Sequence, residues 1–169
     1  DVGNGRRAKV GAIDGSVMAS SISHAISTSQ VTLADVWDVR CTLELRTAEL
    51  AARNRSEQQA DTILAASRAL ASGTDPDAIT RADTAFHQAI ALASGNALFF
   101  QIVRSFEQLM EVAIPKAWEG RTTEEERLET IDLHCKVANA IAERQPDIAR
   151  QAMEQHFARS IGDLFRRGT

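Results

Sequence analysis

Long stretches of this chain repeat apolar residues at intervals of three and four positions, the spacing that gives a helix one apolar face. Valine, isoleucine and threonine almost nowhere alternate with polar residues, as they would in a half-buried strand. The 169 residues include three prolines and nine glycines, and 44% are hydrophobic, enough for one substantial core. We therefore expect an all-α fold: an antiparallel bundle of six to seven helices.

Local start and stop signals divide this pattern into segments. We expect a short helix at about 15–27, and longer helices at about 33–54, 57–71, 75–94, 96 to about 113, 123–143 and 146–166. Ser56, Asp75 followed by Pro76, and Asn96 are typical helix starts, and Thr122 or Thr123 can begin the helix that opens with three glutamates. Pro115 should kink or end the helix that begins at Asn96.

Composition excludes several classes of function. The formal net charge is −4 and the pI is about 5.6, which gives no support for a nucleic-acid surface over the chain as a whole. No apolar run approaches the roughly 18–20 residues that would span a bilayer, and we see no signal peptide. Cys41 and Cys135 make no disulfide framework. We expect a soluble, cytoplasmic protein without a membrane partner.

The placement of the four histidines is the most informative feature of the sequence. His87 lies on the expected third long helix, with Asp83 one turn before it on the same side. His134 and His156 lie on the inward faces of the last two helices. Three imidazoles from three helices thus point toward one interior, while His24 lies in the N-terminal stretch and should be exposed.

A single inward histidine is more often a hydrogen-bonded core residue than a metal ligand. Burying three imidazoles and a carboxylate in one small bundle would cost several kcal/mol unless something satisfied them. A divalent cation such as zinc, nickel or manganese does so in one step. Four protein ligands would complete a tetrahedral structural site, whereas six-coordinate geometry leaves two positions open for oxygens of a chelating acid.

Arg40 is a second informative residue, because it is a charged side chain within a stripe that faces the interior of the bundle. It recurs with Val36 and Leu43, followed by Thr47 and Leu50, on the helix at 33–54. A guanidinium that faces a bundle interior requires a carboxylate or phosphate partner, held by two bonds. Arg40 can therefore bind an acidic effector, but it can equally be solvated or paired with an internal glutamate.

Three runs resemble a known family: VTLADVWDVRCTLELRTAELAA, DTAFHQAIALASGNALF and LHCKVANAIAERQPDIARQAMEQHF. They are similar to the FCD ligand-binding domain of GntR-family bacterial transcription regulators of the FadR subfamily, over about 30–165. The resemblance implies that four residues bind a metal ion, namely Asp83, His87, His134 and His156, and that Arg40 engages the effector's carboxylate. Two departures are visible: Leu133 stands where an acidic residue is usual, and Gln145-Pro146-Asp147 replaces a Gly-Asp turn.

The resemblance also implies a domain layout. GNGRRAKV looks like the end of a winged helix-turn-helix module, so we expect 1–12 to be a wing remnant and the recognition helix to be missing from this chain. Residues 13–30 should form a linker or short helix. Residues 31–169 should be the FCD-like effector-binding and dimerisation domain.

The leading hypothesis is a sensor and not an enzyme. A metal-containing bundle would bind a small organic acid, such as a hydroxy, sugar or dicarboxylic acid, and change operator DNA binding by a homodimer through its winged helix-turn-helix. The alternative is a metal-dependent hydrolase with a three-histidine, one-aspartate site, for which Glu107 and Glu111 are the only candidate bases. A third possibility is a purely structural metal, which predicts no response to small acids.

Overall fold

The computed structural model describes residues 15–165, and within that range every regular element is a helix. These are α1 (Gly15–Ser27), α2 (Leu33–Asn54), α3 (Glu57–Ala71), α4 (Pro76–Ala93), α5 (Ala97–Ser105), α6 (Glu107–Gly120), α7 (Glu124–Ala142) and α8 (Pro146–Phe165). The all-α bundle is confirmed, although the described range holds eight helices and not the expected six to seven. The expected wing remnant at 1–12 lies outside the described residues.

Short-range hydrogen bonds explain why the helix starts match the sequence so closely. Helices α2, α3 and α7 each begin with a capping box, in which the side chains of two residues three positions apart each accept a hydrogen bond from the other residue's backbone amide. The pairs are Thr32 with Asp35, Ser56 with Gln59, and Thr123 with Glu126. Asp75 caps α4 just before Pro76, and Asn96 caps α5. The predicted starts at Ser56, Asp75 and Asn96 are confirmed, and Thr123 is the cap of α7.

The segment expected to form one helix from Asn96 to about residue 113 forms two helices, α5 and α6, which corrects the sequence prediction. The break falls at Phe106, whose backbone φ of −85° and ψ of −4° ends α5 and begins α6. The amide of Phe106 bonds to Val103, three residues back, and the Ser105 hydroxyl bonds the Ile102 carbonyl at 2.6 Å. Pro115 lies inside α6, which continues to Gly120, so it does not end the helix.

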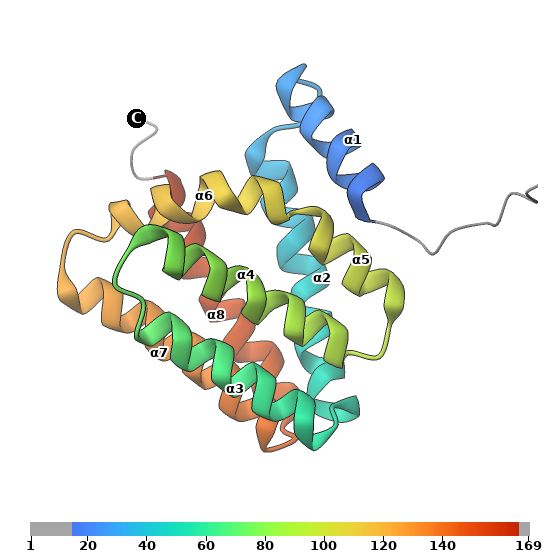
Figure 1. Cartoon of the computed structure of the whole chain (residues 1–169), viewed down its shortest axis with the longest axis vertical. Helices are drawn as coiled ribbons and strands as arrows, with labels where there is room; N and C mark the ends of the chain where they lie inside the picture. Colours follow the sequence, from blue (N-terminus) through green and yellow to red (C-terminus); the bar gives the residue numbers. More distant parts are fainter. Residues whose placement is uncertain (1–14, 166–169) are drawn as a thin grey trace, which may run out of the picture.

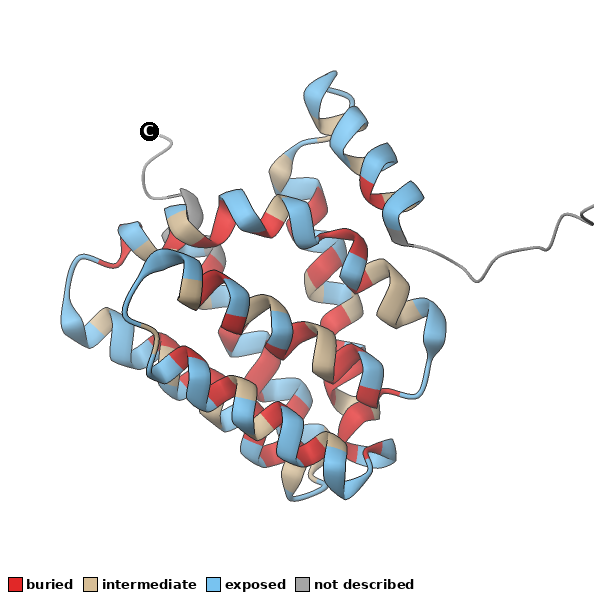
Figure 2. Cartoon of the chain, in the orientation of Figure 1, coloured by how far each residue is buried: buried red, intermediate tan, exposed pale blue. Residues whose placement is uncertain are grey.

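Helix α8 lies in the middle of the bundle and packs against α2, α6 and α7 (Figure 1). Helix α2 also contacts α4 and α7, and α3 packs on α4 and α7. Buried residues follow the inner sides of these helices, whereas α1 packs on α5 and α6 and is largely exposed (Figure 2). Four helices thus enclose one interior: α2, α4, α7 and α8. Between residues 15 and 165 no helix is long and apolar enough to cross a membrane.

Two arginines tie the connection between α2 and α3 to the end of α7. Arg55, which is buried, reaches the last carbonyls of α7: its Nε donates to Ile141 O at 3.4 Å and its Nη2 donates to Ala142 O. Arg144, which has a positive φ of 56°, donates in the opposite direction to Arg53 O at 3.3 Å and Arg55 O at 3.1 Å. This exchange gives the Ala142 carbonyl a donor, and it gives the Ile141 carbonyl a second donor besides the amide of Arg144.

Replacing Arg55 by alanine is expected to lower the free energy of unfolding by about 1–3 kcal/mol, because the Ala142 carbonyl loses its side-chain donor and the Ile141 carbonyl loses one of two donors. Urea denaturation followed by circular dichroism measures the change. Arg53→Ala is the matched control, because the Arg53 side chain is 54% exposed and pairs with Glu49 on its own helix. The control should change stability by less than about 0.5 kcal/mol. Equal losses in both variants would contradict the capping role of Arg55.

Candidate metal centre and adjoining cavity

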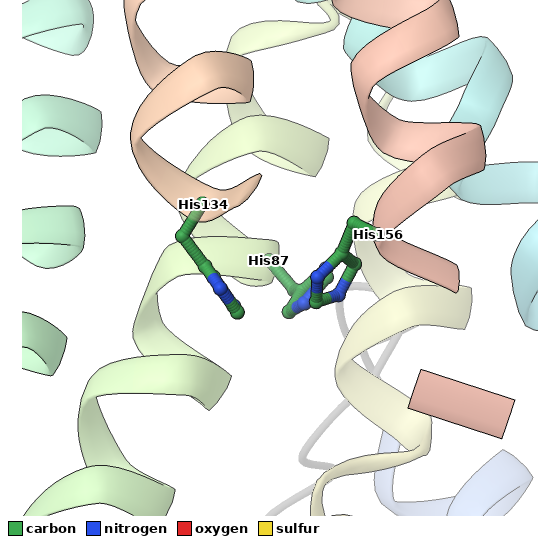
Figure 3. A group of neighbouring side chains, drawn as sticks. All are labelled: His87, His134 and His156. Carbon is green, nitrogen blue, oxygen red and sulfur yellow. The ribbon is translucent and has the colours of Figure 1, made fainter. Parts of the chain in front are cut away.

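Three histidines from three helices meet in the interior of the bundle. His87 comes from α4, His134 from α7 and His156 from α8, and their rings turn toward one another (Figure 3). One ring nitrogen of each lies within 4.8 Å of the others, and all three side chains are buried. Two ligands of one ion lie no more than about 4.4 Å apart when each bond is about 2.0–2.2 Å. Small side-chain adjustments would therefore bring the three nitrogens onto one ion.

Asp83 joins this cluster from the turn of α4 that precedes His87. Its Oδ1 lies 3.0 Å from His134 Nε2, and its Oδ2 lies 3.8 Å from His87 Nε2. Burial by itself would raise the pKa of Asp83, but the hydrogen bond from His134 and the nearby imidazoles outweigh burial and hold that pKa well below its ordinary value. The carboxylate is therefore ionised, as a metal ligand must be. All four residues singled out from the sequence lie together, and their binding of an ion stays a prediction.

Two of the imidazoles are oriented by bonds on the side away from the cluster. His134 Nδ1 donates to the carbonyl of Thr130, one turn earlier on α7, at 2.8 Å. His87 Nδ1 donates to the carboxylate of Glu44 on α2. In both residues the other ring nitrogen, Nε2, points inward toward Asp83 and is the atom that an ion would bind. Leu133 leaves this arrangement intact, because the backbone of Thr130 orients His134 without an acidic neighbour.

His156 provides the test of whether the cluster suits a cation. Its Nδ1 is buried, and within residues 15–165 no group hydrogen-bonds to it. Burial and the two neighbouring imidazoles hold the pKa of His156 well below its ordinary value, so the ring is neutral. A neutral, unbonded imidazole nitrogen beside two others and a carboxylate is the donor set that zinc, nickel or manganese accepts. The residues fit a divalent ion.

Arg40 lies beside the cluster, and its partner was missed in the sequence. Its Nε donates to Glu44 Oε1 at 2.7 Å, so the internal-glutamate alternative describes the structure. The expected inward stripe contained Leu43, but Glu44 is the buried residue and Leu43 is only partly buried. A signal was available: Glu44 follows Arg40 by four residues and precedes Ala48 by four, on one helix face.

A small cavity of about 30 Å³ adjoins the cluster. Its lining includes Asp83, His87 and His156, together with Arg40 and Trp37. By volume it has room for about two water molecules, or for a few non-hydrogen atoms of a ligand. Three of the four predicted metal ligands and the predicted effector residue therefore border the same space.

The remaining candidates lie elsewhere. His24 on α1 is exposed, as expected. Glu107 and Glu111, the only acidic residues considered as general bases, are exposed and line grooves between α4 and α6 that include none of the three histidines. A metal-dependent hydrolase would need a base next to the ion, and neither glutamate occupies that position.

The helical bundle encloses three imidazoles, a carboxylate and an arginine beside a small cavity, and helical bundles build metal and ligand sites from such inward side chains. The chain belongs to the FCD domain family, which it matches over residues 35–159. This confirms the resemblance to the FCD domains of GntR-family regulators, and it assigns the chain to a class of regulatory domains rather than enzymes.

Curated relatives are named as transcription regulators. The chain is 28% identical over 165 residues to the Glc operon transcriptional activator of Escherichia coli K12. This alignment covers 92% of this chain and 64% of that protein. The same activator from Escherichia coli O6:H1 gives identical values. The transcriptional regulatory protein NedR of Micromonospora viridifaciens is 32% identical over 76 residues, 45% of this chain and 53% of that protein. The chain therefore spans less than two thirds of the length of these relatives.

The metal-free domain is expected to lose stability as the pH falls below about 6.5, the ordinary histidine pKa. In the folded state the pKa of His156 is lowered, so below pH 6.5 the unfolded chain binds more protons, and stability decreases as pH decreases. Urea denaturation of chelator-treated protein should show a loss of about 1 kcal/mol or more between about pH 7.5 and 5.5. A His156→Gln variant should lose less stability over the same pH range. Equal losses in the two proteins would show that His156 is not the source of the pH dependence.

Proposed function

We propose that this chain is the effector-sensing domain of a bacterial transcription regulator and that it contains one divalent metal ion, zinc, nickel or manganese. The ion is held by Asp83, His87, His134 and His156. The observation that carries the proposal is the convergence of three buried imidazoles on one carboxylate, with one imidazole nitrogen left unbonded within the described residues. Outside a metal site, such a cluster would be costly to bury.

The effector is a small organic acid: a hydroxy, sugar or dicarboxylic acid. When bound, a divalent ion would supply positive charge and open positions for oxygen ligands. Arg40 binds a further carboxylate or hydroxyl of the same molecule, because its guanidinium borders the same cavity as Asp83 and His87. Arg40 lies over the rings of Trp37 and Phe157, at 5.4 and 5.6 Å from their centroids, and these aromatic contacts hold it in place.

Binding of the acid biases the arrangement of the helices and so changes DNA binding. The intact protein acts as a cytoplasmic homodimer whose winged helix-turn-helix modules contact operator DNA, in line with relatives named as transcription regulators. The site residues come from α2, α4, α7 and α8, so one ligand contacts helices that span most of the bundle. This gives the domain a way to couple occupancy of the cavity to the packing of its helices.

A thermal-shift screen of metal-loaded protein against organic and sugar acids tests the proposal. An acid present at about 100 times its Kd adds about 2.7 kcal/mol, which raises Tm by about 5–10 °C for a domain of this size. Chelator treatment and Arg40→Met should each remove the shift. Arg46→Met is the matched control, because Arg46 lies on the same helix with a half-exposed side chain paired to Glu49, and it should keep the full shift.

A metal-loaded protein whose Tm responds to no acid would support a purely structural metal and contradict the sensor proposal. A shift that persists in Arg40→Met would show that the acid binds elsewhere. Hydrolysis of esters or phosphoesters that depends on added metal would favour the alternative, a metal-dependent hydrolase, although the positions of Glu107 and Glu111 argue against it.

A further inference from the structure

Glu44 is a buried carboxylate that no part of the proposed function uses. It lies in the middle of α2 with 1% of its surface exposed. Its two oxygens have different partners: Oε1 accepts from Arg40 Nε at 2.7 Å, and Oε2 accepts from His87 Nδ1. One residue thus connects the effector-binding arginine to a proposed metal ligand.

The charge of Glu44 decides which nitrogen of His87 carries hydrogen. Arg40 is permanently charged, and its Nε lies 2.7 Å from Glu44 Oε1 in the buried interior, so the two side chains form an ion pair. The carboxylate is therefore ionised and can only accept hydrogen bonds, so His87 Nδ1 must be the donor. His87 Nε2 then presents its lone pair on the side of the ring that faces Asp83, where the proposed ion lies.

Arg40 can bind a ligand without releasing Glu44. Its bond to Glu44 uses Nε, and Nη1 contacts the sulfur of Met110, which is a weak acceptor. An anion in the cavity can therefore engage the terminal nitrogens of the guanidinium while the Nε bond persists. Negative charge that arrives there weakens the pull of Arg40 on Glu44, which strengthens Glu44 as the acceptor for His87.

We propose that Glu44 is a positioning residue that couples Arg40 to His87, so that charge at Arg40 changes how strongly His87 binds the metal ion. This inference rests on the proposed function, and it adds a connection between effector binding at Arg40 and metal binding at His87. Polar partners of metal-bound imidazoles typically alter metal affinity by about 10–100-fold, which sets the expected size of the effect.

Zinc affinity, measured by competition with a chromophoric chelator and with no acid present, tests the coupling. Glu44→Gln keeps the shape of the side chain and should weaken Zn²⁺ binding about 10–100-fold. The matched control is Glu49→Gln: Glu49 also lies on α2 and pairs with two arginines, Arg46 and Arg53, but far less buried. It should bind Zn²⁺ within about twofold of wild type, since exposed ion pairs contribute little. Unchanged affinity in Glu44→Gln would overturn the proposal.

A double-mutant cycle shows whether the coupling passes through Glu44. Arg40→Gln should change Zn²⁺ affinity although Arg40 is no ligand, and the same change should have little effect in a protein that already carries Glu44→Gln. Additive effects of the two substitutions would contradict the proposal. Glu44→Gln alone leaves the buried charge of Arg40 without a partner and could fold poorly for that reason. The double variant removes both buried charges, so it can be measured even then.

Nitrogen NMR of the histidines in metal-free protein separates this proposal from the metal site itself. His87 should be the Nδ1–H tautomer in wild type, and the double variant should show a mixture of tautomers. An Nε2–H tautomer in wild type, or an unchanged tautomer in the double variant, would overturn the role of Glu44. Wild-type protein that binds no zinc would instead refute the metal sensor, while the tautomers still decide whether Glu44 positions His87.

Discussion

The His134→Ala variant is expected to lose its metal: elemental analysis should find close to one ion per chain in wild type and almost none in the variant. His134 contributes a fully buried imidazole whose Nε2 lies 3.0 Å from Asp83 and whose Nδ1 is bonded to Thr130. An ion present at about 100–1,000 times its Kd stabilises the fold by about 2.7–4.1 kcal/mol. Its loss should lower Tm by about 5–15 °C.

Two controls separate loss of the ion from damage to the fold. His24→Ala removes the exposed histidine of α1 and should keep both the metal and the melting temperature. Chelator-treated wild type should melt close to the His134→Ala variant, because both lack the ion. A full complement of metal in His134→Ala would refute the proposed ligand set.

The Phe86→Ala variant is expected to lose about 3–5 kcal/mol of unfolding free energy, the usual cost of deleting a buried phenylalanine ring. Phe86 is completely buried on α4, between the inner faces of the surrounding helices. Its ring centroid lies 5.5 Å from that of His87 and 5.1 Å from that of His134, so it also supports two of the proposed ligands. A large cavity there should loosen both imidazoles and weaken zinc binding as well.

Urea denaturation of metal-free protein measures the stability loss, and chelator competition measures zinc affinity. Phe86→Leu should lose less stability than Phe86→Ala, because part of the volume is restored. Leu92→Ala is the control on the same helix: Leu92 is 53% exposed, so its removal should cost less than about 0.5 kcal/mol. A Phe86→Ala protein as stable as this control would show that the core relaxes around the missing ring.

Helix boundaries could be predicted well because they depend on interactions within a few residues. Ser56, Asp75 and Asn96 each bond backbone amides two or three positions ahead, so the residue types alone indicate where α3, α4 and α5 begin. The split at Phe106 could not be predicted in this way. Residues 97–113 carry a continuous apolar pattern, and Pro115, the only evident helix breaker, is tolerated inside α6.

The candidate site was predictable only in part. Asp83 and His87 share one helix face, and the inward periodicity of α7 and α8 includes His134 and His156, so these four could be chosen from spacing alone. Glu44 could not be chosen with the same ease, because Leu43 is the apolar neighbour and a buried glutamate is rare unless paired. Its partner His87 lies 43 positions away on another helix.

The sequence by itself determined that this chain is helical, where most helices begin, and which four side chains face inward, since these depend on periodicity and on local capping. Only the tertiary structure decided that α2 crosses α4 and α8 so that Glu44, rather than Leu43, faces the histidines, and that Arg40 reaches the same cavity. Helix periodicity gives the direction of a side chain to within about one residue of rotation, whereas a hydrogen bond requires placement within a few tenths of an ångström.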